Sequence, residues 1–315
     1  MRKLALRIGA VDAPNLARKV QTEPVPYLGG VAIVIGVFIA TYTAVIVKSQ
    51  DALLASTVLI PALLMALMGL VDDLRGLQPW PRLIAQSVVG VIVAGILIST
   101  ETIGTPSRIF LIDALVTTIW IVGVCNSINF FDNLDGGAAG TVVVIAFFIF
   151  LIAYDRGQIM ISALSIVTAG ATAGFLIWNK PPAKIYMGDA GALFLGIIVA
   201  VLTIRLKPDI EPFWKSLSIP LFLMAIPLLD TSIAVTSRLS RGISPFTGGR
   251  DHLSHRLMRK GLQRRAAAIT LWALAGVYGT IALAIYKGQS TALIALAAAT
   301  WAYLFFFFIR IPHTD

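Results

Sequence analysis

The sequence predicts an all-α integral membrane protein that forms one domain over residues 1–315, a bundle of about ten transmembrane helices. Hydrophobic residues make up 57% of the chain and charged residues only 13%, whereas a typical soluble domain is about a quarter charged. The apolar residues form blocks of about 20, the length that a helix needs to cross a bilayer. The blocks lack the period-two alternation of membrane strands, so helices are the expected spans.

Ten candidate spans follow one another along the chain, and no repeat or low-complexity linker divides them. They are residues 28–47, 53–71, 82–100, 109–126, 138–154, 158–178, 190–206, 215–237, 266–286 and 289–309. Of the 25 Lys and Arg residues, 18 fall on the N-terminal segment and every second loop after it. The positive-inside rule then places both termini in the cytoplasm. A role in phosphate binding is the alternative explanation of the net charge of +9.

The unusual polar residues gather on four of the expected cytoplasmic loops, about 72–82, 126–137, 179–189 and 238–265. The outer loops contain nothing comparable, so the sequence predicts an active site at the cytoplasmic membrane surface. The polar residues are Asp72, Asp73, Arg75 and Arg82 in the first loop; Asn126, Asn129, Asp132 and Asp135 in the second; Asn179, Lys184 and Asp189 in the third; and Arg250, His252, His255 and Arg256 in the fourth.

Carboxylates beside the hydrocarbon are costly and tend to pair or to mark function. Asp72 and Asp73 end one apolar span, and Asp189 begins another. Zinc would need Cys or several His ligands, whereas Mg²⁺ takes one or two carboxylates and leaves positions for phosphate oxygens. Aspartates beside cations therefore favour magnesium-assisted phosphoryl transfer.

The segment NSINFFDNLDGG places a polar residue at every third position, at Asn126, Asn129, Asp132 and Asp135. If the preceding helix continues through it, these side chains form one stripe that points into the site. A polar seam between packed helices is the alternative explanation.

Four segments, in order, resemble motifs of the polyprenyl-phosphate N-acetylhexosamine-1-phosphate transferases. They are VDAPNLARKVQTEPVPYLGG, GLVDDLRGL, NSINFFDNLDGGAAG and NKPPAKIYMGDAGALFLG. The resemblance implies transfer of a sugar-1-phosphate from a UDP-N-acetylhexosamine to a polyprenyl phosphate. The products are UMP and a polyprenyl-pyrophosphate sugar that initiates cell-wall or surface-polysaccharide synthesis, and the reaction requires Mg²⁺.

The resemblance also implies roles for individual residues. Asp132 corresponds to a contact with uracil and Tyr186 to an aromatic side chain that stacks on it. Asp189 corresponds to the magnesium ligand, and Asp72 and Asp73 to a pair assigned to the acceptor phosphate. The loop with His252 and His255 corresponds to one that touches the pyrophosphate. We expect Arg250 and Arg256 around the same diphosphate. Lys184 and Lys19 are secondary candidates for phosphate contacts, and surface lysines that follow the positive-inside rule are the alternative explanation.

The sequence departs from the family pattern at several positions. Gln21 stands where His is common, Asn133 replaces a usual Gly, and Ala192 replaces a usual Ser. The sequence HLSH, in place of a tighter histidine cluster, favours the UDP-GlcNAc branch over the muramoyl-pentapeptide branch. The family usually has another span before VDAP; either the start was assigned late or this member does without it.

Several alternatives stay open from the sequence. Direct in-line attack by the acceptor phosphate is favoured over a covalent phospho-aspartate at Asp73. Asp230 either lines the site or pairs with Arg238. A secondary transporter would also carry polar residues in its spans, but near the bilayer midplane. No nucleic-acid partner is expected, and spans rich in Gly and Ala would permit a homodimer.

Overall fold

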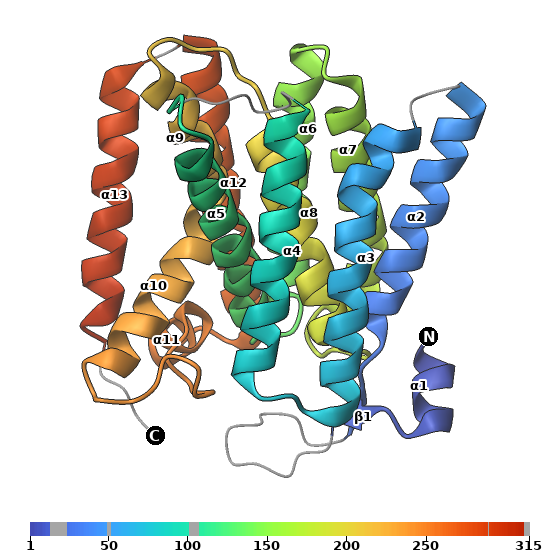
Figure 1. Ribbon diagram of the computed structural model, residues 1–315. Coiled ribbons are helices and arrows are strands. Elements are labelled where there is room, and N and C mark those ends of the chain that lie inside the picture. The colour runs from blue at the N-terminus through green and yellow to red at the C-terminus, as the bar shows by residue number, and fades with distance from the viewer. Residues whose placement is uncertain (13–23, 49–51, 101–106, 289, 312–315) are drawn as a thin grey trace.

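The computed structural model describes residues 1–12, 24–48, 52–100, 107–288 and 290–311, which form a bundle of long helices (Figure 1). Within these residues, nine helices are long and apolar enough to cross a membrane. The predicted all-α membrane bundle is therefore confirmed. The nine are α2 (Gly29–Lys48), α3 (Ala52–Arg75), α4 (Pro79–Ser99), α5 (Phe110–Phe131), α6 (Gly137–Asp155), α7 (Ile159–Asn179), α8 (Gly188–Arg205), α12 (Arg264–Gly288) and α13 (Thr291–Ile309).

The span expected at 215–237 is not one straight helix. Helices α9 (Phe213–Leu223) and α10 (Ala225–Leu239) meet at Met224 with a bend of 72°. Pro227 has no N–H to donate to the carbonyl of Leu223, and its ring would clash with that carbonyl. Counted as one broken span, the pair brings the candidate spans among the described residues to ten.

Helix α8 forms the centre of the bundle. About 83% of its apolar stretch is buried, and it packs against α2, α3, α5, α6 and α7. A helix that is apolar on all sides is expected at such a position. The surrounding helices expose large apolar side chains outward, among them Ile46, Leu111 and Tyr303, which suits a lipid environment.

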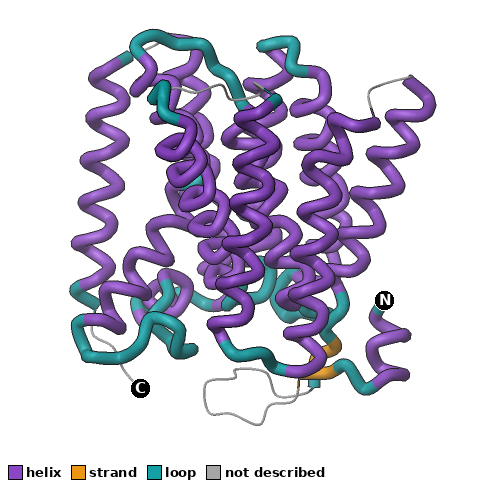
Figure 2. Tube along the Cα trace, in the orientation of Figure 1, coloured by secondary structure: helices purple, strands orange, loops and turns teal. Residues whose placement is uncertain are grey.

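The polar loops lie together at one end of the bundle, which we call the site end. It carries the α3–α4, α5–α6 and α7–α8 connections, the short helices α1 (Arg2–Ile8) and α11 (Leu253–Arg259), and the strands (Figures 1 and 2). Strand β1 (Val11–Asp12) pairs antiparallel with β2 (Val25–Pro26). The next residue, Tyr27, bridges to Tyr186, so the segments that precede α2 and α8 are held side by side.

Small residues bring the helix ends at the site end very close together. A Cβ on Gly69 of α3 would lie 2.4 Å from the carbonyl oxygen of Asp189, and one on Gly30 of α2 would lie 2.4 Å from the Cα of Gly191. Such small-residue contacts allow close helix packing in membranes. Here they bring the carboxyl end of α3 to the amino end of α8.

Candidate active site

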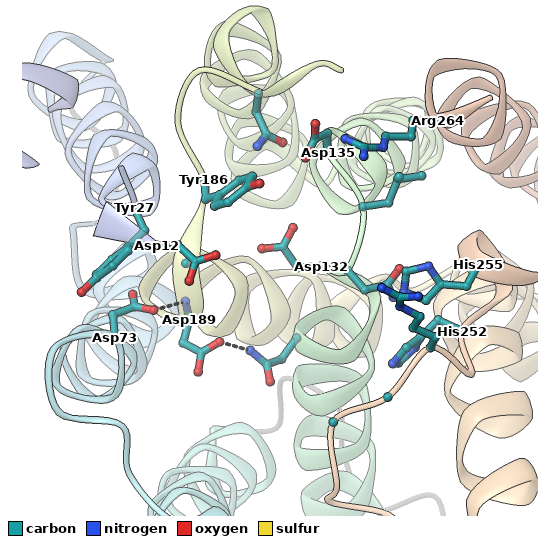
Figure 3. Close-up of a pocket in the computed structure, with 18 of the residues that line it drawn as sticks. Asp12, Tyr27, Asp73, Asp132, Asp135, Tyr186, Asp189, His252, His255 and Arg264 are labelled. Carbon is teal, nitrogen blue, oxygen red and sulfur yellow. Dashed lines mark hydrogen bonds between the residues drawn. The ribbon is translucent and has the colours of Figure 1, made fainter. Parts of the chain in front are cut away.

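A cavity of about 580 Å³ opens at the site end between segments that are far apart in the sequence. Figure 3 shows Asp73, Asp189 and Asp12 gathered on one side of it and the two histidines on the other, with Asp132 and Tyr186 between them. The lining carboxylates are Asp12, Asp73, Asp132, Asp135 and Asp189, and the lining basic side chains are Arg250, His252, His255 and Arg264.

Asp73 holds the beginning of α8. Its Oδ1 accepts the backbone N–H of Asp189 at 2.8 Å, and its Oδ2 accepts that of Ala190 at 3.1 Å. The first amides of a helix have no partner within the helix, and a carboxylate there also interacts favourably with the helix dipole. Asp73 on α3 therefore caps α8 and places Asp189 beside it.

Gly188 makes this cap sterically feasible. Its φ is +72°, a left-handed conformation that suits glycine. A Cβ at Gly188 would lie 2.6 Å from Oδ2 of Asp73. The Met-Gly-Asp segment thus needs glycine both for its backbone conformation and for the close approach of the carboxylate.

Asp72 and Asp189 are linked by one arginine from α4. The Nη1 of Arg82 lies 2.5 Å from Oδ2 of Asp72 and 2.9 Å from Oδ2 of Asp189. Asp72 also accepts the N–H of Leu77 at 2.6 Å, and Asp189 accepts the side-chain amide of Asn129 at 2.7 Å. Asp189 therefore receives donors from α4 and α5 at once, while the buried Asp72 lies outside the cavity lining.

The expected four-residue polar stripe does not form, because α5 ends at Phe131. Asp132 lies on the α5–α6 loop and points into the cavity (Figure 3). Its carboxylate makes no hydrogen bond or ion pair with any residue that the structure describes. Desolvation, with the negative charges of Asp73 and Asp135 nearby, raises the pKa of Asp132 to about 7.

Asp135 anchors the other side of this loop. It accepts the backbone N–H of Ala183 at 3.0 Å, and burial raises its pKa. Gly136 donates its N–H to Asn179, whose amide in turn donates to the carbonyl of Ile185. These contacts join the α5–α6 and α7–α8 loops, so Asp132 and Tyr186 are positioned together.

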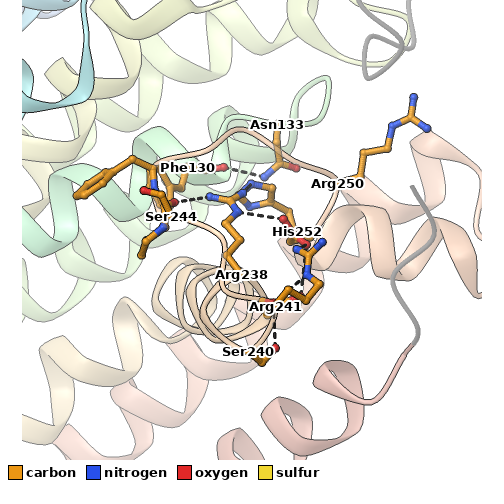
Figure 4. Close-up of polar contacts among 12 residues, drawn as sticks. Phe130, Asn133, Arg238, Ser240, Arg241, Ser244, Arg250 and His252 are labelled. Carbon is orange, nitrogen blue, oxygen red and sulfur yellow. Dashed lines mark hydrogen bonds and ion pairs between the residues drawn. The ribbon is translucent and has the colours of Figure 1, made fainter.

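His252 has a partner at each ring nitrogen, and Figure 4 shows one of them, Arg238, beside it. Nδ1 lies 2.8 Å from Oδ2 of Asp230, and Nε2 lies 3.0 Å from Nη2 of Arg238. Because a guanidinium can only donate, Nε2 accepts and Nδ1 carries the proton. His252 is thus a neutral, buried side chain held by Asp230 and Arg238. Neither alternative for Asp230 is found: Asp230 does not line the cavity, and Arg238 pairs with Asp251 at 2.9 Å.

His255 is the histidine that remains available to a ligand. It lines the cavity, and its ring nitrogens make no hydrogen bond within the described residues. Burial lowers its pKa to about 4. His255 is therefore neutral near pH 7 and offers one N–H donor and one acceptor.

The cavity suits a divalent ion bound together with phosphates. Asp132 has no partner among the residues that the structure describes and lies among carboxylates, and Asp189 faces the same space. No group of three His, Cys, Asp or Glu side chains is arranged as a complete metal cage among the described residues. Mg²⁺ usually takes only one or two carboxylates and completes its shell with water and substrate oxygens, so the donor set fits.

The structure places three expected substrate contacts outside the cavity lining. The side-chain amide of Asn126 donates to Gln86 at 2.5 Å, and the Lys184 ammonium lies 5.7 Å from the centre of the Trp178 ring. Arg256 is buried, and its Nη1 donates to the carbonyls of Phe308 and Ile311, each at 2.8 Å. Arg256 thus ties α11 to the end of α13, and none of the three lines the cavity.

Several lining residues were missed by the sequence interpretation. Asp12 and Tyr27 come from the N-terminal segment, and Asn133 and Arg264 lie within two of the expected loops. Asp12 lies within the VDAP motif, which was a usable signal, whereas Arg264 had been counted only as a topology charge. Lys19 and Gln21 lie outside the described residues.

A polytopic bundle with carboxylates and cations around one cavity at its end defines a membrane-embedded phosphate-handling enzyme. Comparison with known proteins agrees. Residues 54–207 match the model of glycosyl transferase family 4. A probable undecaprenyl-phosphate N-acetylglucosaminyl 1-phosphate transferase of Bacillus subtilis is 31% identical over 320 aligned positions, covering 99% of this chain and 84% of the relative.

Two further relatives belong to two branches. A decaprenyl-phosphate N-acetylglucosaminephosphotransferase of Mycolicibacterium smegmatis is 30% identical and covers 93% of this chain and 80% of the relative. A phospho-N-acetylmuramoyl-pentapeptide-transferase of Streptococcus thermophilus is 31% identical but covers only 48% of this chain and 49% of the relative. The chain belongs to the polyprenyl-phosphate N-acetylhexosamine-1-phosphate transferases of glycosyl transferase family 4.

Proposed function

We propose that the protein transfers GlcNAc-1-phosphate from UDP-GlcNAc to a polyprenyl phosphate, with Mg²⁺, at the cytoplasmic face of the bacterial inner membrane. The product would start a cell-wall or surface polysaccharide. The observation that carries the proposal is the convergence of Asp73, Asp132, Asp189, Arg250 and His255 on one cavity at one end of a membrane bundle. The relatives that cover nearly the whole chain are named for N-acetylglucosamine phosphate transfer.

The reaction needs little proton transfer but strong charge compensation. The acceptor is a phosphate monoester with a second pKa of about 6, so it is mostly ionised at pH 7. One of its oxygens attacks the phosphorus that carries the sugar, and the bond from that phosphorus to UMP breaks. Two unit charges about 4 Å apart repel by roughly 4 kcal/mol at an effective dielectric near 20. A bound Mg²⁺ would offset this repulsion and stabilise the leaving UMP.

The chain's own residues divide this work between the two sides of the cavity. Asp189, fixed by Asn129 and by the Asp73 cap on α8, would hold the ion. Arg250 and the neutral His255 would donate to the diphosphate. Tyr186 and Asp132 would bind the base. Because both oxygens of Asp73 already accept backbone amides, direct attack by the acceptor is favoured over a covalent phospho-aspartate.

A UMP-release assay with UDP-GlcNAc, polyprenyl phosphate and Mg²⁺ tests the proposal. The purified protein should release UMP, EDTA should stop the release, and added Mg²⁺ should restore it. Asp189→Asn should reduce turnover to background, whereas Asp155→Asn, at the far end of the bundle, should keep it. If no UDP-hexosamine gives UMP, the proposed transferase activity is wrong. If Asp189→Asn keeps full activity, the proposal that Asp189 holds Mg²⁺ is wrong.

The muramoyl-pentapeptide transferase reaction is the second candidate within the family. The alignment with the muramoyl-pentapeptide transferase covers about half of this chain. The alignment with the N-acetylglucosaminyl 1-phosphate transferase covers nearly all of it. A panel of UDP-sugars, including the muramoyl-pentapeptide nucleotide, should show the highest kcat/KM for UDP-GlcNAc. A transporter is disfavoured because Asp73 and Asp189 lie in contact at the helix ends. The homodimer stays a prediction.

A further inference from the structure

Arg82 is a cation that the mechanism above leaves without a role. A single nitrogen, Nη1, contacts both Asp72 and Asp189, at 2.5 and 2.9 Å. Its Nε and Nη2 have no hydrogen-bond partner within the described residues. The side chain is 23% exposed, so part of it is accessible from outside the protein, although Arg82 does not line the cavity.

The position of Arg82 sets it apart from the other cations of the site. Arg264 lines the cavity beside Asp135 (Figure 3), and Arg250 lines it from the loop that leads to His252. Arg82 approaches the aspartates from the first turn of α4. Among the described residues, it is the only Lys or Arg with a side-chain contact to Asp72 or Asp189.

The first turns of α4 also face lipid. Trp80 and Ile84 are 61% and 62% exposed, and the Trp80 ring packs against Phe246 with centroids 5.6 Å apart. Trp is favoured at the headgroup level of a membrane. A phosphate carried on a lipid chain and moving along α4 would therefore reach Arg82 at the depth of the headgroups.

The charge balance at this point requires a cation for an anionic ligand. Three carboxylates, Asp72, Asp73 and Asp189, lie within one connected set of contacts. A phosphate monoester adds further negative charge. A guanidinium is suited to bridge the carboxylates and the phosphate, since its planar donors can bind carboxylate on one side and phosphate on the other.

We propose that Arg82 binds the phosphate of the lipid acceptor through Nε and Nη2 while Nη1 remains on the aspartates. The identity of the lipid rests on the proposed function; the phosphate contact does not. A second consequence follows from the Asp189 contact. Arg82 and a divalent cation draw on the same carboxylate, so the arginine weakens metal binding until a phosphate engages it.

Substitution of Arg82 by Gln tests both consequences. The KM for undecaprenyl phosphate should rise about tenfold, the effect of losing a charge-assisted hydrogen bond, while the KM for UDP-GlcNAc changes by less than about twofold. The Kd of Mn²⁺ for the detergent-solubilised protein without substrates, followed by electron paramagnetic resonance, should fall several-fold. Arg82→Lys, which keeps the charge but loses the fork, should lie between wild type and Arg82→Gln on both measurements.

Arg82→Gln is expected to raise the KM for undecaprenyl phosphate and to lower the Kd for Mn²⁺. These opposite changes distinguish phosphate binding by Arg82 from a purely structural role. If Arg82→Gln weakens Mn²⁺ binding and raises the KM for undecaprenyl phosphate and the KM for UDP-GlcNAc together, Arg82 only positions the aspartates and the proposal is overturned. A rise confined to the KM for UDP-GlcNAc would assign Arg82 to the donor and would also overturn it. Arg75→Gln is the matched control, because Arg75 is exposed on the same end of the bundle and should leave all three constants unchanged.

Direct binding separates this proposal from failure of the proposed function. If wild-type protein releases no UMP, retention of radiolabelled undecaprenyl phosphate by wild type and Arg82→Gln still measures the contact. Loss of retention in Arg82→Gln alone supports the phosphate contact, whereas equal retention by the two proteins removes it.

Discussion

Substitution of Gly188 by Ala tests the geometry on which the site depends. The added Cβ would lie 2.6 Å from Oδ2 of Asp73, and the φ of +72° is unfavourable for any L residue with a side chain. We expect the Asp73 carboxylate to withdraw by several tenths of an ångström, so that at least one of its two hydrogen bonds to α8 is lost. The beginning of α8 and Asp189 would shift with it.

The size of the effect follows from these contacts. The left-handed conformation costs an Ala about 1–2 kcal/mol, and loss of a hydrogen bond to a charged group costs about 1.5–3 kcal/mol. The free energy of unfolding should therefore fall by about 2.5–5 kcal/mol. A displacement that approaches 1 Å at a reacting group can cost about a hundredfold in rate, so kcat should fall by about that factor.

Thermal unfolding in detergent and UMP release measure the two effects separately. Gly170→Ala is the matched control: Gly170 lies within α7 at ordinary helical φ, and nothing lies within 4 Å of a Cβ placed there. Ala is favoured over Gly in a helix by about 0.5–1 kcal/mol, so this variant should keep its activity and its stability. Gly188→Ala with unchanged kcat and unchanged melting temperature would refute the view that Asp73 caps α8.

Three further predictions concern other parts of the site. Asp251→Ala should lower the free energy of unfolding by about 3–5 kcal/mol, because Arg238 is then left buried without its carboxylate; thermal unfolding measures this, and an unchanged melting temperature would contradict it. The Asp132 carboxyl has a pKa of about 7 in the folded protein and of about 3.9 in the unfolded chain. The folded protein therefore binds the proton of Asp132 more tightly than the unfolded chain does. The melting temperature without Mg²⁺ should therefore fall as pH rises from 5 to 7, more steeply in wild type than in Asp132→Asn; equal slopes would show that Asp132 does not titrate there. Ser254 of α11 donates a hydrogen bond to Asn133 of the α5–α6 loop. The effects of Ser254→Ala and Asn133→Ala on kcat/KM should therefore not be additive, whereas full additivity would mean that the two residues act independently.

The comparison of sequence and structure is clearest for the α5–α6 loop. The three-residue spacing of Asn126, Asn129, Asp132 and Asp135 predicted a continuous helical stripe, but α5 ends at Phe131. Asn129 turns to Asp189, while Asn126 turns to Gln86 on α4. The spacing correctly marked a polar segment, but a period in the sequence cannot say where a helix ends or which neighbour a side chain meets.

The basic residues show the same limit. The sequence places Arg250, Arg256 and Arg264 in the same expected loop. In the structure, however, Arg256 is buried and donates to backbone carbonyls, whereas Arg264 lines the cavity. His252 and His255 differ in a similar way, since only His255 keeps its ring nitrogens free of described partners. These differences come from contacts with α10, α12 and α13, which no local pattern encodes.

The sequence alone determined the membrane class, the approximate spans and the one-sided distribution of acidic and basic residues, because apolar run length and charge placement respond directly to the thickness and polarity of a bilayer. It also carried the family, through four motifs in order. The tertiary structure decided which of those residues share a cavity. Close contacts at Gly30, Gly69 and Gly188 bring α2, α3 and α8 together, and that proximity depends on packing between segments more than 100 residues apart in the chain.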